Sequence, residues 1–119
     1  MIDSDILAPM RVAGWESRNR VWLAPMTNLQ SHADGRLGDD ELAWLESRAA
    51  GGFGVVQTCA THVSRDGQGW EGELGVFDDA LIDDWRRIAD ACHRHGARVV
   101  AQLFHGGARA LARVGPWSA

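Results

Sequence analysis

The sequence predicts an α/β fold built on a parallel β-sheet. Three short runs are almost continuously apolar and rich in β-branched residues, a pattern typical of strands that helices bury on both faces. Two helical patterns separate these runs, and the order strand, helix, strand, helix, strand makes two successive βαβ units. The three predicted strands are Val21–Met26, Val55–Ala60 and Arg98–Phe104.

The first predicted helix is Asp39–Ala50, which follows the first strand. It places Leu42, Leu45 and Ala49 on one stripe, and Gly51 follows the last helical residue. Apolar residues at this spacing form the buried face of an amphipathic helix, and glycine is the usual residue after a helix end.

The second predicted helix, Asp79–His95, has the clearer pattern. Its apolar residues recur at i, i+4, i+7 and i+11, the spacing of one buried helix face. Positive charge in its last turn suits the helix dipole, and Gly96 ends it. A short hairpin over Leu7–Trp15 is predicted to lie against the first strand. The apolar residues of the second helix are Leu81, Trp85, Ile88 and Cys92.

The length of the chain leaves two architectures open. Its 119 residues are enough for about one domain, but three parallel strands cannot close a barrel, and a (β/α)₈ barrel takes roughly 250 residues. Three strands with two helices would leave a sheet edge and much helix-facing surface uncovered. The fold is therefore either a small open α/β sheet or part of something larger.

Composition excludes several classes of function. The net charge is −4, from 12 basic and 16 acidic residues, so the chain has no general field that attracts nucleic acid or anionic lipid. No stretch approaches the ~20 apolar residues of a membrane span, and acidic residues stand near the start, where a secretory signal would carry lysines. Cys59 and Cys92 form no CxxC pair, which is typical of reduced thiols. We therefore expect a cytoplasmic protein with no nucleic-acid or membrane partner.

Four polar residues lie where the predicted strands end. In parallel α/β proteins, sites gather at the carboxyl ends of the strands, so Thr27, His62, Gln102 and His105 are expected to converge on one face. Small uncharged hydrogen-bonding groups beside glycines suit a flat polar heterocycle. Each residue also has a structural explanation: Thr27 as a turn residue, His105 as a loop residue, and Gln102 as an amide that bonds a backbone group.

Other candidate motifs fail on position or spacing. The glycine-rich stretch at 51–54 precedes a strand, whereas a dinucleotide fingerprint follows one. The aspartates at 78–84 lack the spacing of a calcium loop and fit the start of a helix. His93 and His95 have no carboxylate or cysteine to complete a metal set, so no metal site is predicted.

Several motifs in order resemble the Old Yellow Enzyme, or NADH:flavin oxidoreductase, family. NRVWLAPMTN, over Asn19–Asn28, is similar to the family's first strand. A glycine-rich loop over Gly67–Gly75, an aspartate-led second helix and a QLxHxG-type end of the third strand follow at matching positions. The resemblance runs from about Leu7 to Arg109, which is nearly the whole chain.

The resemblance implies a flavin enzyme. Members of the family hold FMN at the top of a (β/α)₈ barrel; NAD(P)H reduces the flavin, and flavin N5 passes hydride to an activated alkene, usually an enone. Residues 1–119 would then be the N-terminal βαβαβ portion of an FMN-binding TIM-barrel domain, with about three strands, two helices and an incomplete barrel. The cofactor carries the chemistry, and the protein positions and tunes it.

The resemblance also assigns site residues. Pro25 and Met26 would lie along the isoalloxazine ring, and Thr27 would bond near its O4/N5 edge and tune its potential. Ala60 would offer backbone contacts to the pyrimidine side of the ring, and Gln102 a side-chain hydrogen bond to it. His105 would lie further out, towards the substrate.

Departures from the family pattern leave two functions open. Cys59 stands where many relatives have glutamate, so the local pairing must differ. The chain ends before the fourth strand, it lacks the His-His or His-Asn pair that grips the substrate carbonyl, and it contains no tyrosine. One hypothesis is an ene-reductase that acts only within a complete barrel. The other is a truncated, catalytically inactive barrel fragment that acts only by pairing with a complementary chain or not at all. The open sheet edge also predicts association with copies of itself.

Overall fold

The computed structural model confirms the predicted order of strands and helices. It describes residues 5–111; residues 1–4 and 112–119 of the predicted domain lie outside this range. Short 3₁₀ turns precede the second helix and follow the last two strands. The main elements are β1 (Met10–Val12), β2 (Trp15–Ser17), β3 (Trp22–Leu23), α1 (Asp39–Ala50), β4 (Val55–His62), α2 (Ile82–Arg94) and β5 (Arg98–Phe104).

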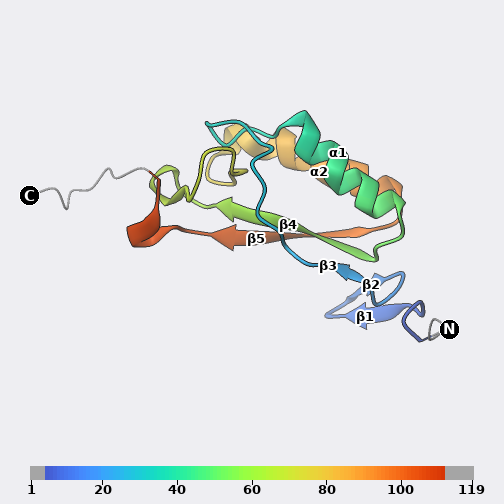
Figure 1. Ribbon diagram of the computed structural model, residues 1–119. Helices are drawn as coiled ribbons and strands as arrows, with labels where there is room; N and C mark the ends of the chain where they lie inside the picture. The colour runs from blue at the N-terminus through green and yellow to red at the C-terminus, as the bar shows by residue number, and fades with distance from the viewer. Residues whose placement is uncertain (1–4, 112–119) are drawn as a thin grey trace, which may run out of the picture.

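The main sheet is parallel, with β4 between β3 and β5. Figure 1 shows both helices on the same side of this sheet. Within residues 5–111 the sheet does not close on itself, and no helix covers its other face. The described chain is therefore a parallel sheet with a helical layer on one face only, as expected of part of a barrel.

The core lies between the two helices and the sheet. Leu45 and Ala49 of α1, Ile88 and Cys92 of α2, and Val56 of β4 are all buried in one cluster. These positions include most of the two predicted helical stripes, because residues three or four apart share one face of a helix. Within residues 5–111, neither helix has the length and apolar composition needed to cross a bilayer.

Two predicted strand boundaries are wrong. β3 has two residues instead of the six of Val21–Met26, because Pro25 has no backbone N–H for a sheet ladder and the chain turns away before it. β4 is two residues longer than predicted and ends at His62. Its extension is held by a returning loop, since the His62 amide donates to the Leu74 carbonyl at 3.1 Å.

The predicted N-terminal hairpin is present, but its strands run from Met10 to Ser17 rather than over Leu7–Trp15. β1 and β2 form a separate antiparallel sheet, and the ring of Trp15 lies 6.2 Å from that of Trp22 in β3, so the hairpin packs against the first strand as expected.

Arg18 attaches this hairpin to the rest of the chain: its guanidinium donates to the carbonyls of Ala49 (2.6 Å), Phe53 (2.9 Å) and His95. Arg18 thereby bonds carbonyls at the C-terminal ends of both helices, where positive charge is favourable.

Candidate functional site

The carboxyl ends of β3, β4 and β5 meet at one end of the sheet, which we call the rim. Ala60 and Gln102 are register partners there, so two predicted flavin residues lie side by side on neighbouring strands. Thr27 lies in the loop that follows β3, the other neighbour of β4. The rim consists of residues 24–31 after β3, 60–75 at the end of β4, and 102–111 at the end of β5.

A β-bulge in β4 determines which residue pairs with Gln102. The register between β4 and β5 changes between Gln57 and Ala60, so β4 has one residue more than β5 over this stretch. The hydroxyl of Thr58 accepts from the Gln102 amide N–H at 3.3 Å, and the Thr61 hydroxyl donates to the Gln102 carbonyl at 2.9 Å. Both threonines are buried. Bulges of this kind re-aim side chains beside binding sites, and here two hydroxyls fix one backbone position.

The side chains of Thr27 and Gln102 have unused hydrogen-bonding capacity. Within residues 5–111, the structure gives neither side chain a hydrogen-bond partner, although the Gln102 backbone is held at both ends. Thr27 is exposed, Met26 is 47% exposed, and Ala60 adds little side-chain bulk. Free polar groups beside a small residue and an exposed methionine can bond the edge of a flat ring and pack against its face. This arrangement fits a flavin ring.

His62 does not join this set, contrary to the sequence prediction. Its ring is buried and stacks on Phe77 at 5.1 Å between centroids. Its Nδ1 lies 3.5 Å from a carboxylate oxygen of Glu73, which is also buried. Burial lowers the pKa of His62 and raises the pKa of Glu73 to about 7. His62 is therefore a packed neutral ring in the interior of the rim rather than at its surface, because the loop up to Gly75 folds back over it.

His105 lies at the outer end of the rim and is about half exposed. Its Nδ1 accepts from the Gly107 amide at 3.0 Å, and its Nε2 is 3.7 Å from a carboxylate oxygen of Asp66. These contacts hold the ring between its own loop and the loop after β4. The substrate role implied for His105 therefore stays a prediction.

The loop after β4 connects the three parts of the rim. The indole N–H of Trp70 donates to the Asn28 carbonyl at 2.9 Å, and its ring contacts Phe104 at 5.5 Å between centroids. The Gly106 amide donates to the Gly67 carbonyl at 2.8 Å. This loop therefore ties the segment after β3 to the segment after β5.

The family model of the NADH:flavin oxidoreductase / NADH oxidase family matches residues 5–115. The chain belongs to this family. Among its relatives, Probable NADH-dependent flavin oxidoreductase YqiG of Bacillus subtilis is 34% identical over 95 residues, which are 80% of this chain and 25% of YqiG. An NADPH dehydrogenase of Listeria monocytogenes is 37% identical over 95 residues, 79% of this chain and 28% of that protein.

Solved structures of Old Yellow Enzymes share this fold. The homologue from Zymomonas mobilis superimposes with a TM-score of 0.78 and 30% identity, over 85% of this chain and 28% of that chain. This member of the NADH:flavin oxidoreductase family therefore spans about a quarter of the length of the relatives it matches. One face of the sheet is uncovered because, in a complete barrel, the remaining strands would lie on that side.

Sequence reasoning missed a buried carboxylate in this family member, Glu41 of α1. Its Oε1 accepts from the thiol of Cys59 at 2.8 Å, and the residue is fully buried. Burial, and then the charge of Glu41, raises the pKa of Cys59 well above its usual range. The sequence predicted that Cys59 has a different partner from the glutamate of its relatives, and the structure shows that this partner is Glu41 of α1. Glu41 lies four residues before Leu45, and that helical spacing placed it on the buried stripe.

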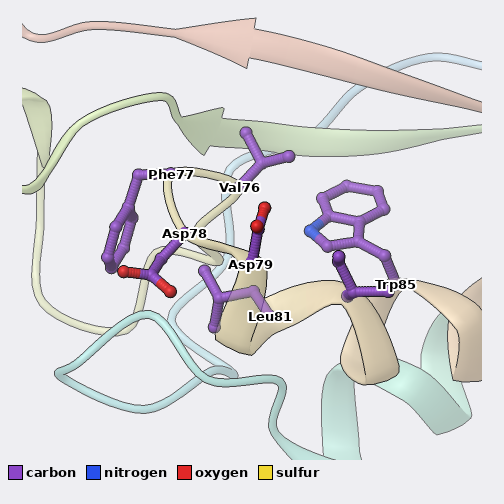
Figure 2. A pocket seen from close by; sticks show the side chains of 7 residues that line it. Val76, Phe77, Asp78, Asp79, Leu81 and Trp85 are labelled. Atoms are coloured by element: carbon purple, nitrogen blue, oxygen red, sulfur yellow. The ribbon is translucent and has the colours of Figure 1, made fainter.

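A pocket of about 600 Å³ lies on the helix side of the sheet, at the start of α2. Figure 2 shows Phe77 and Trp85 flanking it, with Asp78 and Asp79 between them. None of the predicted flavin residues borders it, so it is separate from the proposed flavin site. The pocket is lined by Val76, Phe77, Asp78, Asp79, Leu81, Ile82 and Trp85.

Proposed function

We propose that residues 1–119 form the N-terminal βαβαβ portion of an FMN-binding barrel that reduces activated alkenes, such as enones, with NAD(P)H. The observation that carries the proposal is the state of Gln102. Its backbone is fixed by Thr58 and Thr61 beside Ala60, while its side-chain amide has no partner within residues 5–111. A rigidly held free amide at a strand end is what recognition of a flavin edge requires.

The chain's own residues would bind and orient the ring. Gln102 would bond the pyrimidine side of the isoalloxazine, Ala60 would allow close backbone approach, and Thr27 would bond near the O4/N5 edge. Pro25 and Met26 would cover part of the ring and exclude water. Bound FMN would supply hydride transfer from NAD(P)H to the alkene. Substrate and phosphate contacts belong to the later strands of such a barrel, so catalysis requires the complete fold.

A chimaera tests this function. Residues 5–111 would replace the matching segment of YqiG, which gives a completed barrel. We expect this completed barrel to bind FMN stoichiometrically and to oxidise NADH or NADPH faster when an enone is added. A completed barrel that folds, as judged by circular dichroism and gel filtration, but binds no FMN would refute the proposal.

The second candidate is an inactive fragment that pairs with a complementary chain or with a second copy. The uncovered sheet face and the exposure of Leu103 (67%) and Leu29 (71%) favour it, because open sheet edges and large apolar patches drive association. Light scattering on the 119-residue chain tests it. Oligomers, or a complex with the separately expressed remainder of YqiG, are expected; a monodisperse monomer in both samples would refute pairing.

A further inference from the structure

The carboxylate of Glu41 receives side-chain donors from the loop after β3, which belongs to the rim, and from β4 just before the rim. Ser31 donates its hydroxyl to Oε2, and Asn28 donates its amide to Oε1 at 3.3 Å. Cys59 donates its thiol to the same Oε1 at 2.8 Å. Glu41 itself is 0% exposed. One buried group on the first turn of α1 therefore bonds both the loop after β3 and the β4 residue next to Ala60.

The two loop residues bonded by Glu41 also organise the loop itself. The Asn28 side-chain oxygen accepts from the Gln30 amide at 3.1 Å, and the Ser31 hydroxyl accepts from the Gly38 amide at 3.2 Å. Asn28 is the residue after Thr27. The position of Thr27 is thus fixed from one side through contacts that converge on Glu41.

The burial of this carboxylate needs a reason beyond packing. Glu41 occupies a helix stripe shared with Leu45 and Ala49, where an apolar side chain would fill the space without desolvating a carboxylate. Replacing buried polar groups with apolar ones is often neutral or stabilising. The carboxylate is best explained by what it holds in place, which is the loop that carries Thr27.

We propose that Glu41 is a positioning residue of the flavin site, which sets the loop Pro25–Ser31 against the end of β4 so that Thr27 and Ala60 meet the same ring. The proposal rests on the proposed function, since it assumes that the rim receives a flavin. Glu41 does not touch the ring; it acts through Asn28, Ser31 and Cys59. Its removal frees the loop, and the binding-competent arrangement becomes a minority of the ensemble.

The test uses the completed barrel with Glu41→Leu and Glu41→Gln. Leucine removes both acceptor oxygens, whereas glutamine keeps one. We expect Glu41→Leu to weaken FMN binding at least tenfold, equal to about 1.4 kcal/mol, and Glu41→Gln to recover part of the loss. Hydrogen exchange of the FMN-free protein gives an independent readout: amides of residues 25–31 should exchange faster in Glu41→Leu, with exchange in Arg98–Phe104 unchanged.

Two control variants separate positioning from loss of stability. Asp40→Asn removes an exposed carboxylate from the same helix turn and should leave FMN affinity unchanged. Ile88→Ala empties a core position on α2 and should destabilise the fold without loosening the loop. Equal loss of FMN affinity in Ile88→Ala and Glu41→Leu would overturn the proposal. If Glu41→Leu does not fold, Ser31→Ala must show the same direction of change, and unchanged loop exchange and affinity in it would overturn the proposal.

The parent barrel distinguishes the two claims. If the unmutated completed barrel binds no FMN, the proposed function fails and the loop exchange alone decides the role of Glu41 in holding residues 25–31. If the parent binds FMN and Glu41→Leu binds it equally well, only the positioning role fails.

Discussion

Replacement of Gln102 by leucine should separate binding of the cofactor from stability of the fold. The side-chain amide makes no hydrogen bond within residues 5–111, while the backbone is held by Thr58 and Thr61. Leucine therefore removes no internal bond, and the free energy of unfolding should change by no more than about 0.5 kcal/mol. One or two hydrogen bonds to the flavin, each worth about 0.5–1.5 kcal/mol, would be lost. The FMN dissociation constant should therefore rise roughly 2- to 150-fold.

The assay is fluorescence titration of FMN into the completed barrel, beside urea denaturation of the FMN-free protein. Gln57→Leu is the matched control, because Gln57 pairs with Val100 lower on the same strands and its register places it on the same sheet face as Gln102. The control should leave the dissociation constant unchanged. An unaltered dissociation constant in Gln102→Leu, or an equal rise in Gln57→Leu, would refute the role of Gln102.

Three further results are expected in the completed barrel. Arg18→Met removes three bonds to helix-end carbonyls and should lower the free energy of unfolding by about 2–4 kcal/mol in urea, with FMN affinity kept; a loss below about 0.5 kcal/mol would contradict the attachment role. Burial raises the pKa of Glu73 from 4.5 to about 7, so between these pH values the folded state binds a proton at Glu73 that the unfolded state does not. The free energy of unfolding therefore falls as pH rises from 4.5 to about 7. Glu73→Gln should therefore gain about 1–3 kcal/mol relative to the parent between pH 4.5 and pH 8, and a pH-independent difference in urea denaturation would count against it. Thr27→Ala should change the rate of flavin reduction by NAD(P)H several-fold, as the loss of one hydrogen bond of about 1 kcal/mol predicts, without changing stability; identical stopped-flow rates would exclude that role.

The parts of the fold that depend on local pattern were predictable from the sequence. The apolar runs at Val55–Ala60 and Arg98–Phe104 became neighbouring parallel strands, and the stripe of Ile88 and Cys92 became the buried face of α2. These features follow from side-chain periodicity, which the sequence carries directly. The pairing of Ala60 with Gln102 at the rim does not follow from this pattern, because it depends on the bulge between Gln57 and Ala60.

Features that depend on distant partners were not predictable in the same way. His62 was expected at the rim, but the returning loop buried it against Glu73 and Phe77. Glu73 shows no periodic pattern, so nothing in the local sequence marks it as buried. Glu41 did fit the helical pattern, since it precedes Leu45 by four residues. A charged residue at such a position is, however, ordinarily expected at the solvent-exposed border of the apolar stripe. Its burial is explained by the donors that reach it from Asn28, Ser31 and Cys59.

A crystal structure of the completed barrel with FMN tests most directly whether three neighbouring strand ends receive the ring. We expect the isoalloxazine at the rim, with the Gln102 amide and the Thr27 hydroxyl within hydrogen-bonding distance of it, at about 2.7–3.2 Å, and Ala60 against its pyrimidine side. An isoalloxazine bound elsewhere in the barrel, with Gln102 and Thr27 facing solvent, would contradict it.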